Sequence, residues 1–136
     1  YRIGDYVAVA TESCGCGRTH ARAVGGPIGR SDDMLKVHGV VIFPSDVEAL
    51  VRRVRELSNE FMLILTSAPH GGEELTIQVE PVPGVPEAEF TTLKHRMAND
   101  VRVGLGIRAE LQVLPAGTLP RAEFKSQRVR VERSAP

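Results

Sequence analysis

Three short segments of the chain place charged side chains beside glycines, where a ligand can approach the backbone closely. Residues 1–5 end in Asp5 after a glycine, residues 29–39 hold Arg30 and two aspartates, and residues 117–125 end in Lys125. A carboxylate suits a diol, and an ammonium on a loop bounded by proline and glycine can meet a developing negative charge. Taken singly, each segment also has a plain structural explanation: an aspartate turn, a solvated charged turn and a solvated lysine.

Composition excludes some classes of partner. The 136 residues carry 17 basic and 17 acidic side chains, so there is no electrostatic reason to expect nucleic acid or a membrane surface as a partner. No apolar run approaches the roughly 20 residues of a membrane span. The chain opens without Met or a leader, and we interpret it as a piece of a longer protein. Cys14 and Cys16 are too close for an unstrained disulfide, which fits a cytoplasmic protein.

The periodicity from residue 40 onward predicts an α+β unit. A turn at His38 and Gly39 precedes it, and Ser45 with Glu48 predicts a capping box at the start of the first helix. Strand 75–80 alternates strictly and is expected to pair antiparallel with the buried strand before it. The expected elements are a strand at 40–43, a helix that starts at Pro44-Ser45 and has apolar positions up to Leu57, strands at 61–66 and 75–80, a helix from Pro86 that Gly104 and Gly106 end, and a strand at 110–114.

This β-α-β-β-α-β order predicts a ferredoxin-like sandwich of two helices on an antiparallel sheet. Before it stands a glycine-rich flap, whose strand-like residues 6–10 need a neighbour. After it comes a proline- and glycine-containing loop with the lysine, then a short alternating stretch through Val129 and Val131. His38, His70 and His95 have no recognisable partners and are interpreted as surface residues. Many activities use such a fold, so function must come from the flanking motifs.

Together and in this order, the three segments resemble three late motifs of the adenylate-forming superfamily of acyl-CoA synthetases. Residues 29–44, with Asp32-Asp33-Met34 and the ending Val41-Ile42-Phe43-Pro44, are most similar to phenylacetate-CoA ligases, as is the tail at 119–125. The resemblance covers nearly the whole chain. It implies that residues 1–31 end the large N-terminal domain and that residues 32–136 form the mobile C-terminal domain.

The resemblance also implies roles for single residues. Asp5 matches the acid that binds the ATP ribose, Arg30 an arginine that holds the nucleotide, and Asp32 the hinge of domain rotation. Gly39 matches a glycine that lines the pantetheine tunnel. Lys125 matches the catalytic lysine, which bridges the substrate carboxylate and the α-phosphate when the acyl-AMP forms.

The partners implied are an aryl or arylacetic acid, ATP with Mg²⁺, coenzyme A and the missing N-terminal domain, with a homodimer left open. The phosphate loop and the acyl pocket belong to that missing domain in the family, so the fragment alone is expected to be inactive. The residues around Cys14 and Cys16 are similar to a Cys-x-Cys-Gly element that joins a structural zinc site in some relatives. His20 is a candidate for the third ligand, and the remaining ligands would come from the N-terminal portion that precedes this chain. The alternative there is a pair of free thiols.

Two positions depart from the family pattern. Ile3 stands where threonine is usual, and Phe124 stands where a glycine commonly precedes the lysine. Glycine there can adopt a positive φ, which phenylalanine adopts only with strain. Two other functions stay open: an adenylating enzyme that delivers the acyl group to a carrier protein or another acceptor, and a ferredoxin-like module that binds a ligand without catalysis.

Overall fold

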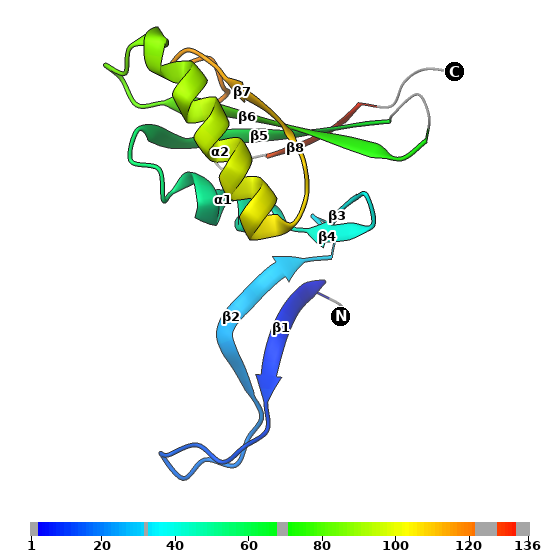
Figure 1. Cartoon of the computed structure of the whole chain (residues 1–136). Coiled ribbons are helices and arrows are strands. Elements are labelled where there is room, and N and C mark those ends of the chain that lie inside the picture. Colours follow the sequence, from blue (N-terminus) through cyan, green and yellow to red (C-terminus); the bar gives the residue numbers. More distant parts are fainter. Residues whose placement is uncertain (1–2, 32, 68–70, 122–127, 133–136) are drawn as a thin grey trace.

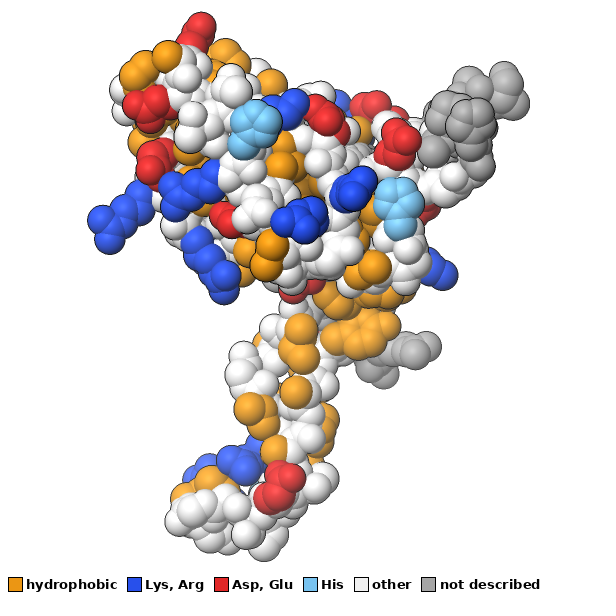
Figure 2. All heavy atoms as spheres, in the orientation of Figure 1, with side chains coloured by type: hydrophobic (Ala, Val, Ile, Leu, Met, Phe, Trp, Pro, Cys, Tyr) orange, Lys and Arg blue, Asp and Glu red, His pale blue; other side chains and the backbone are white. Residues whose placement is uncertain are grey.

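The flap is a β-hairpin. The computed structural model describes residues 3–31, 33–67, 71–121 and 128–132. Strand β1 (Asp5–Ala10) pairs antiparallel with β2 (Arg22–Arg30), which is the neighbour that the sequence requires for residues 6–10. The hairpin projects from the rest of the molecule (Figure 1). Figure 2 shows hydrophobic side chains along it; those exposed include Val7, Val9, Val24 and Ile28.

The base of the hairpin touches the body through Phe43. The Tyr6 and Phe43 ring centroids lie 5.7 Å apart. A Cβ on Gly29 would lie 2.6 Å from the Phe43 ring, so this close approach requires glycine at position 29. The Ser45 hydroxyl donates a hydrogen bond of 3.2 Å to the Ile28 carbonyl. These few contacts join the hairpin to the start of the first helix.

A second, shorter hairpin follows. Strands β3 (Leu35–Val37) and β4 (Val40–Ile42) pair antiparallel, and the predicted turn at His38 and Gly39 is confirmed. Both turn residues have positive φ, 48° for His38 and 84° for Gly39. A two-residue hairpin turn with this signature matches the right-handed twist of its strands, and glycine takes the second position at little cost.

Helix α1 (Pro44–Val51) begins at the predicted Pro44-Ser45 and is shorter than predicted. The predicted capping box is wrong. Asp46 accepts the Phe43 backbone N–H at 2.8 Å, whereas Ser45 donates to Ile28 and Glu48 pairs with Arg52. The apolar spacing continues beyond the helix because Val54 and Leu57 still reach the core, although from turns and the start of a strand.

The main sheet has four strands in the order β7-β6-β5-β8: β5 (Leu57–Ser67), β6 (Glu73–Pro81), β7 (Glu110–Val113) and β8 (Val129–Glu132). The antiparallel pairing of β5 with β6 is confirmed. The single antiparallel sheet of the ferredoxin-like prediction is wrong, because β4 pairs with β3 in a separate sheet. In its place β8 pairs parallel with β5, while β7 pairs parallel with β6.

The second helix follows the prediction closely. A 3₁₀ turn, η1 (Glu87–Glu89), leads into α2 (Phe90–Leu105), and Gly106 ends the helix in the left-handed conformation. Both helices lie on the same face of the sheet (Figure 1), and α2 buries a stripe of Leu93, Met97 and Val101. The fold is therefore a mixed α+β layer of two helices on a sheet. Neither helix, nor any other in the described ranges, is long and apolar enough to cross a bilayer.

One buried side chain of the sheet is charged. Glu80 at the end of β6 is 0% exposed and is the only buried polar or charged residue in the part of the chain that the structure describes. Alternation along β6 directs Leu75, Ile77 and Val79 toward the helices, which leaves Glu80 on the opposite face of the sheet. A loop that follows β7 covers it there.

Candidate active-site elements

The two predicted nucleotide ligands are neighbours. Asp5 and Arg30 are directly paired across the hairpin, and their side chains form an ion pair with 3.5 Å between Oδ1 and Nη1. The Asp5 side chain is 23% exposed and that of Arg30 48%. Residues 25 positions apart in the sequence are thus brought to one spot at the base of the hairpin. The carboxylate could accept hydrogen bonds from ribose hydroxyls, and the guanidinium could donate hydrogen bonds to a phosphate.

The predicted hinge, Asp32, lies outside the described residues. On either side, the Ser31 N–H donates to the Gly4 carbonyl at 2.7 Å, and the Asp33 N–H donates to the Arg30 carbonyl at 3.2 Å. The residues on both sides of position 32 are therefore hydrogen-bonded to the hairpin. Beyond this point β3 belongs to the body of the molecule.

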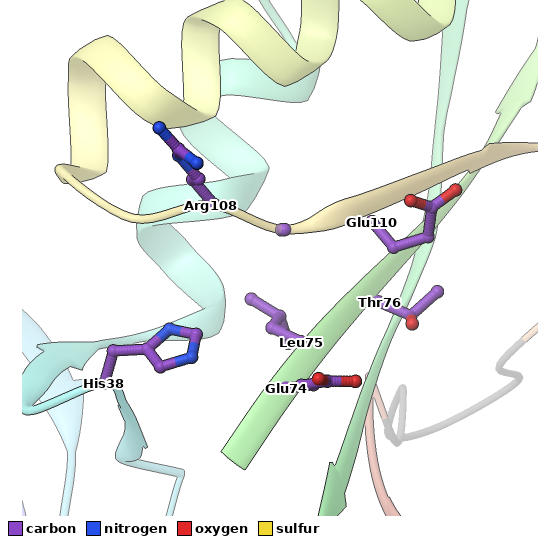
Figure 3. Close-up of a pocket in the computed structure, with 7 residues that line it drawn as sticks. His38, Glu74, Leu75, Thr76, Arg108 and Glu110 are labelled. Atoms are coloured by element: carbon purple, nitrogen blue, oxygen red, sulfur yellow. The ribbon is translucent and has the colours of Figure 1, made fainter. Parts of the chain in front are cut away.

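Gly39 lies at an open tip. A Cβ built on it meets no atom within 4 Å, so this chain alone gives no steric reason for glycine beyond the positive φ. Its neighbour His38 lines a pocket of about 330 Å³, with residues of β6 and of the segment that enters β7 (Figure 3). The pocket wall carries charges of both signs, including Glu74, Arg108 and Glu110.

The predicted catalytic lysine, Lys125, also lies outside the described residues. The loop before it, residues 115–121, is described, and we call it the anchored loop because Glu80 holds it. The Glu80 carboxylate accepts the backbone N–H of Gly117 at 3.2 Å and that of Leu119, and pairs with the Arg121 guanidinium at 3.1 Å. Leu119 is buried, at 7% exposure. The loop is therefore fixed to the sheet up to four residues before Lys125.

Sequence reasoning missed Glu80 because a strictly alternating strand places it among outward-facing residues. Two signals could have found it. Leu119 is the one large aliphatic side chain in residues 115–121, which indicates that the loop packs on something. A loop that packs on a sheet brings backbone N–H groups with it, and these need acceptors.

The cysteine segment lies at the far end of the hairpin. Cys14 and Cys16 are free thiols, and the Gly17 N–H donates to the Cys14 carbonyl at 2.8 Å in a tight turn. Hydrogen bonds from Cys14 and from the backbone at Arg18 lower the pKa of the Cys16 thiol, which favours the thiolate that a metal would bind. Within the described ranges no three His, Cys, Asp or Glu side chains lie close enough to hold a metal, so His20 does not complete a set here.

Comparison with known proteins agrees with this arrangement. The family described as "AMP-binding enzyme C-terminal domain" matches residues 39–133. A phenylacetate-coenzyme A ligase of Thermus thermophilus is 33% identical over 138 residues, a match that covers 90% of this chain and 31% of the relative. The chain thus spans about a third of the length of that relative.

Two solved structures of 2-hydroxyisobutyryl-CoA ligase are also similar. In the postadenylation state, in complex with R3-HIB-AMP, that ligase matches with a TM-score of 0.81 and 28% identity over 95% of this chain and 28% of its own. In the thioesterification state, in complex with 2-HIB-AMP and CoA, it matches with a TM-score of 0.70 and 28% identity over 96% of this chain and 28% of its own. The chain belongs to the family of AMP-binding enzyme C-terminal domains and resembles the one carried by phenylacetate-coenzyme A ligases.

Proposed function

We propose that this chain is the C-terminal part of a longer ligase that activates an aryl or arylacetic acid with ATP and then transfers the acyl group to coenzyme A. The observation that carries the proposal is the family match over residues 39–133 together with a phenylacetate-CoA ligase as a relative over most of the chain. In the first half-reaction a carboxylate oxygen attacks the α-phosphorus of Mg·ATP and pyrophosphate leaves. In the second, the CoA thiol attacks the acyl carbon and AMP leaves.

The proposed domain division places residues 1–31 with the large domain and residues 32–136 in a domain that rotates between the half-reactions. The two states of one ligase support it. Nearly the same share of this chain matches both, yet the TM-score falls from 0.81 to 0.70. A rigid unit would match two states of one protein equally well, so the drop is consistent with the hairpin and the body moving relative to one another. In a rotation of this kind, a few linking residues absorb the change of backbone angles. Asp32 is the proposed hinge residue.

The function is tested with the full-length protein. Acid-dependent exchange of pyrophosphate into ATP, measured across a panel of aryl and arylacetic acids, reports the first half-reaction. Formation of the CoA thioester reports the second. Exchange with no thioester would exclude CoA as the acceptor and favour a carrier protein. No exchange with any acid would refute the ligase function altogether.

Asp5 and Arg30 are proposed to hold the nucleotide. An Asp5→Asn variant should raise the KM for ATP in the exchange assay about tenfold, because a hydrogen bond to a charged group contributes about 1.5–3 kcal/mol. The maximal exchange rate should change by less than about threefold, and folding should be unaffected because an exposed ion pair contributes only about 0–1 kcal/mol. Asp100→Asn, the same change on α2, serves as the control. An unchanged KM would remove Asp5 from the nucleotide site.

We further propose that Cys14 and Cys16 supply two ligands of a structural zinc ion, with the other ligands from outside this chain. Metal analysis of the full-length protein should then find about one zinc per chain, because four tetrahedral ligands hold one ion. The Cys14→Ser/Cys16→Ser double variant should lose it, whereas His20→Ala should retain it. Equal zinc content in the wild type and the double variant would leave the cysteines as free thiols.

A further inference from the structure

Glu80 is a buried acid that does not belong to the apolar core. Its carboxylate lies outside the main apolar cluster, on the face of the sheet opposite the helices. Burying a carboxylate is unfavourable unless hydrogen bonds and an opposite charge compensate for it. Among the described residues, the groups that compensate for Glu80 all come from the anchored loop: the N–H groups of Gly117 and Leu119 and the guanidinium of Arg121. The bonds that the structure describes for this buried carboxylate therefore all hold that loop.

The same network extends to Arg128, at the start of the segment that forms β8. Arg121 also pairs with Glu60 of β5, with 3.5 Å between Nη1 and Oε1. Arg128 lies within 4.0 Å of the other Glu60 oxygen and donates to the Asn59 carbonyl at 2.9 Å. Its guanidinium also stacks 4.3 Å from the centre of the Phe61 ring. Arg121 and Arg128, which border residues 122–127, are therefore both held by the same end of the sheet.

We propose that Glu80 is a positioning residue for acyl-adenylate formation, acting through the anchored loop that leads to Lys125. The inference rests on the proposed function, in which Lys125 takes part in the first half-reaction. A lysine that must bridge two reacting groups depends on where its segment starts, and small misplacements of a catalytic group lower the rate strongly. Arg121 transmits the position because its one guanidinium contacts both Glu80 and Glu60.

The test compares the two half-reactions in the full-length protein. Glu80→Gln keeps the size of the side chain but removes its charge. Arg121→Ala removes the charged partner of Glu80, and because the Arg121 side chain is 57% exposed, it leaves the buried core intact. Both variants should lose about tenfold in pyrophosphate exchange, about 1.4 kcal/mol. Both should form the CoA thioester from presynthesised acyl-AMP within about twofold of the wild-type rate. Glu56→Gln, which removes an exposed pair with Arg96, is the matched control and should change neither rate.

A double-mutant cycle separates positioning from general stability. If Glu80 acts through the lysine, Glu80→Gln should lower the residual exchange of a Lys125→Ala protein by less than about twofold, since neighbours in one pathway are not additive. A full tenfold loss in that background overturns the inference, as does an equal loss in both half-reactions or wild-type exchange in Glu80→Gln and Arg121→Ala. If Glu80→Gln does not fold, Arg121→Ala decides alone. Exchange by the wild type tests the proposed function itself, so its failure is distinguishable from failure of the inference.

Discussion

A Lys125→Ala variant of the full-length protein should lose at least about a hundredfold in acid-dependent pyrophosphate exchange, which corresponds to roughly 2.7 kcal/mol of transition-state stabilisation. The proposed reason is electrostatic. As the carboxylate oxygen attacks the α-phosphorus, negative charge passes from the carboxylate to the α-phosphoryl oxygens and the leaving pyrophosphate. An ammonium between the two anionic groups reduces their repulsion and stabilises the transition state more than the separate reactants. Formation of the thioester from presynthesised acyl-AMP should be nearly unchanged, because that step needs no such bridge.

The control is another lysine of the same chain. Lys94 on α2 pairs with Glu110 at the surface, with 2.7 Å between Nζ and Oε1, and Lys94→Ala should leave both half-reactions unchanged. If Lys125→Ala exchanges as well as the wild type, the catalytic role must be withdrawn. Phe124, in a place where glycine is usual in the family, would then be the first residue to consider, because a side chain there restricts the backbone angles before the lysine.

A Gly39→Leu variant should affect the two half-reactions in the opposite way to Lys125→Ala. Thioester formation should fall at least about a hundredfold, roughly 2.7 kcal/mol, while pyrophosphate exchange stays within about threefold. In this chain a Cβ at position 39 meets no atom within 4 Å, so the substitution creates no clash at that atom. If Gly39 lines the passage of the CoA thiol when the domains meet, leucine there would fill that passage. The measurement compares the initial rates of the two half-reactions with saturating ATP and acid.

Backbone strain is the competing explanation, and the chain offers a matched control for it. Gly84, in the loop after β6, has a φ of 97° and also has nothing within 4 Å of its Cβ position, so Gly84→Leu imposes a similar conformational cost. That cost is of the order of 1–3 kcal/mol of stability and should not separate the half-reactions. Equal rates of thioester formation in Gly39→Leu and wild type would remove Gly39 from the CoA passage.

Local patterns predicted the secondary structure well and its pairing less well. The strict alternation of 75–80 and the helical stripe of Leu93, Met97 and Val101 each had one compatible structure, and both were found. Residues 40–43 were assigned to the main sheet because a short apolar run fits any strand. The pairing of residues 40–42 depends on the turn at His38 and Gly39, which joins β4 to β3 in a tight hairpin. The place that remained is taken by β8, which lies far along the sequence from its parallel partner β5.

The candidate site shows the same division. Asp5 and Arg30 could be singled out by residue type and motif, and the hairpin brings them together. Glu80 could not be singled out from β6 alone, since its burial is produced by a loop some 35 to 40 residues further along the chain, and alternation within β6 contains no trace of that loop. Asp32 and Lys125 rest on the resemblance, since both lie outside the described residues.

The contact of Phe43 with the base of the hairpin has a consequence for turnover. Tyr6 and Gly29 stand on one side of the proposed hinge, and Phe43 and Ser45 stand on the other. Each rotation of the domain would have to break this small aromatic and hydrogen-bonded contact and form it again. A ligase that cycles between two orientations needs both to be populated, and a free-energy gap of about 5.5 kcal/mol separates a 1:99 from a 99:1 mixture. One tilted ring pair and one surface hydrogen bond are weak enough to keep that balance within reach of the substrates, whereas a broad apolar interface at this place would hold the enzyme in a single orientation.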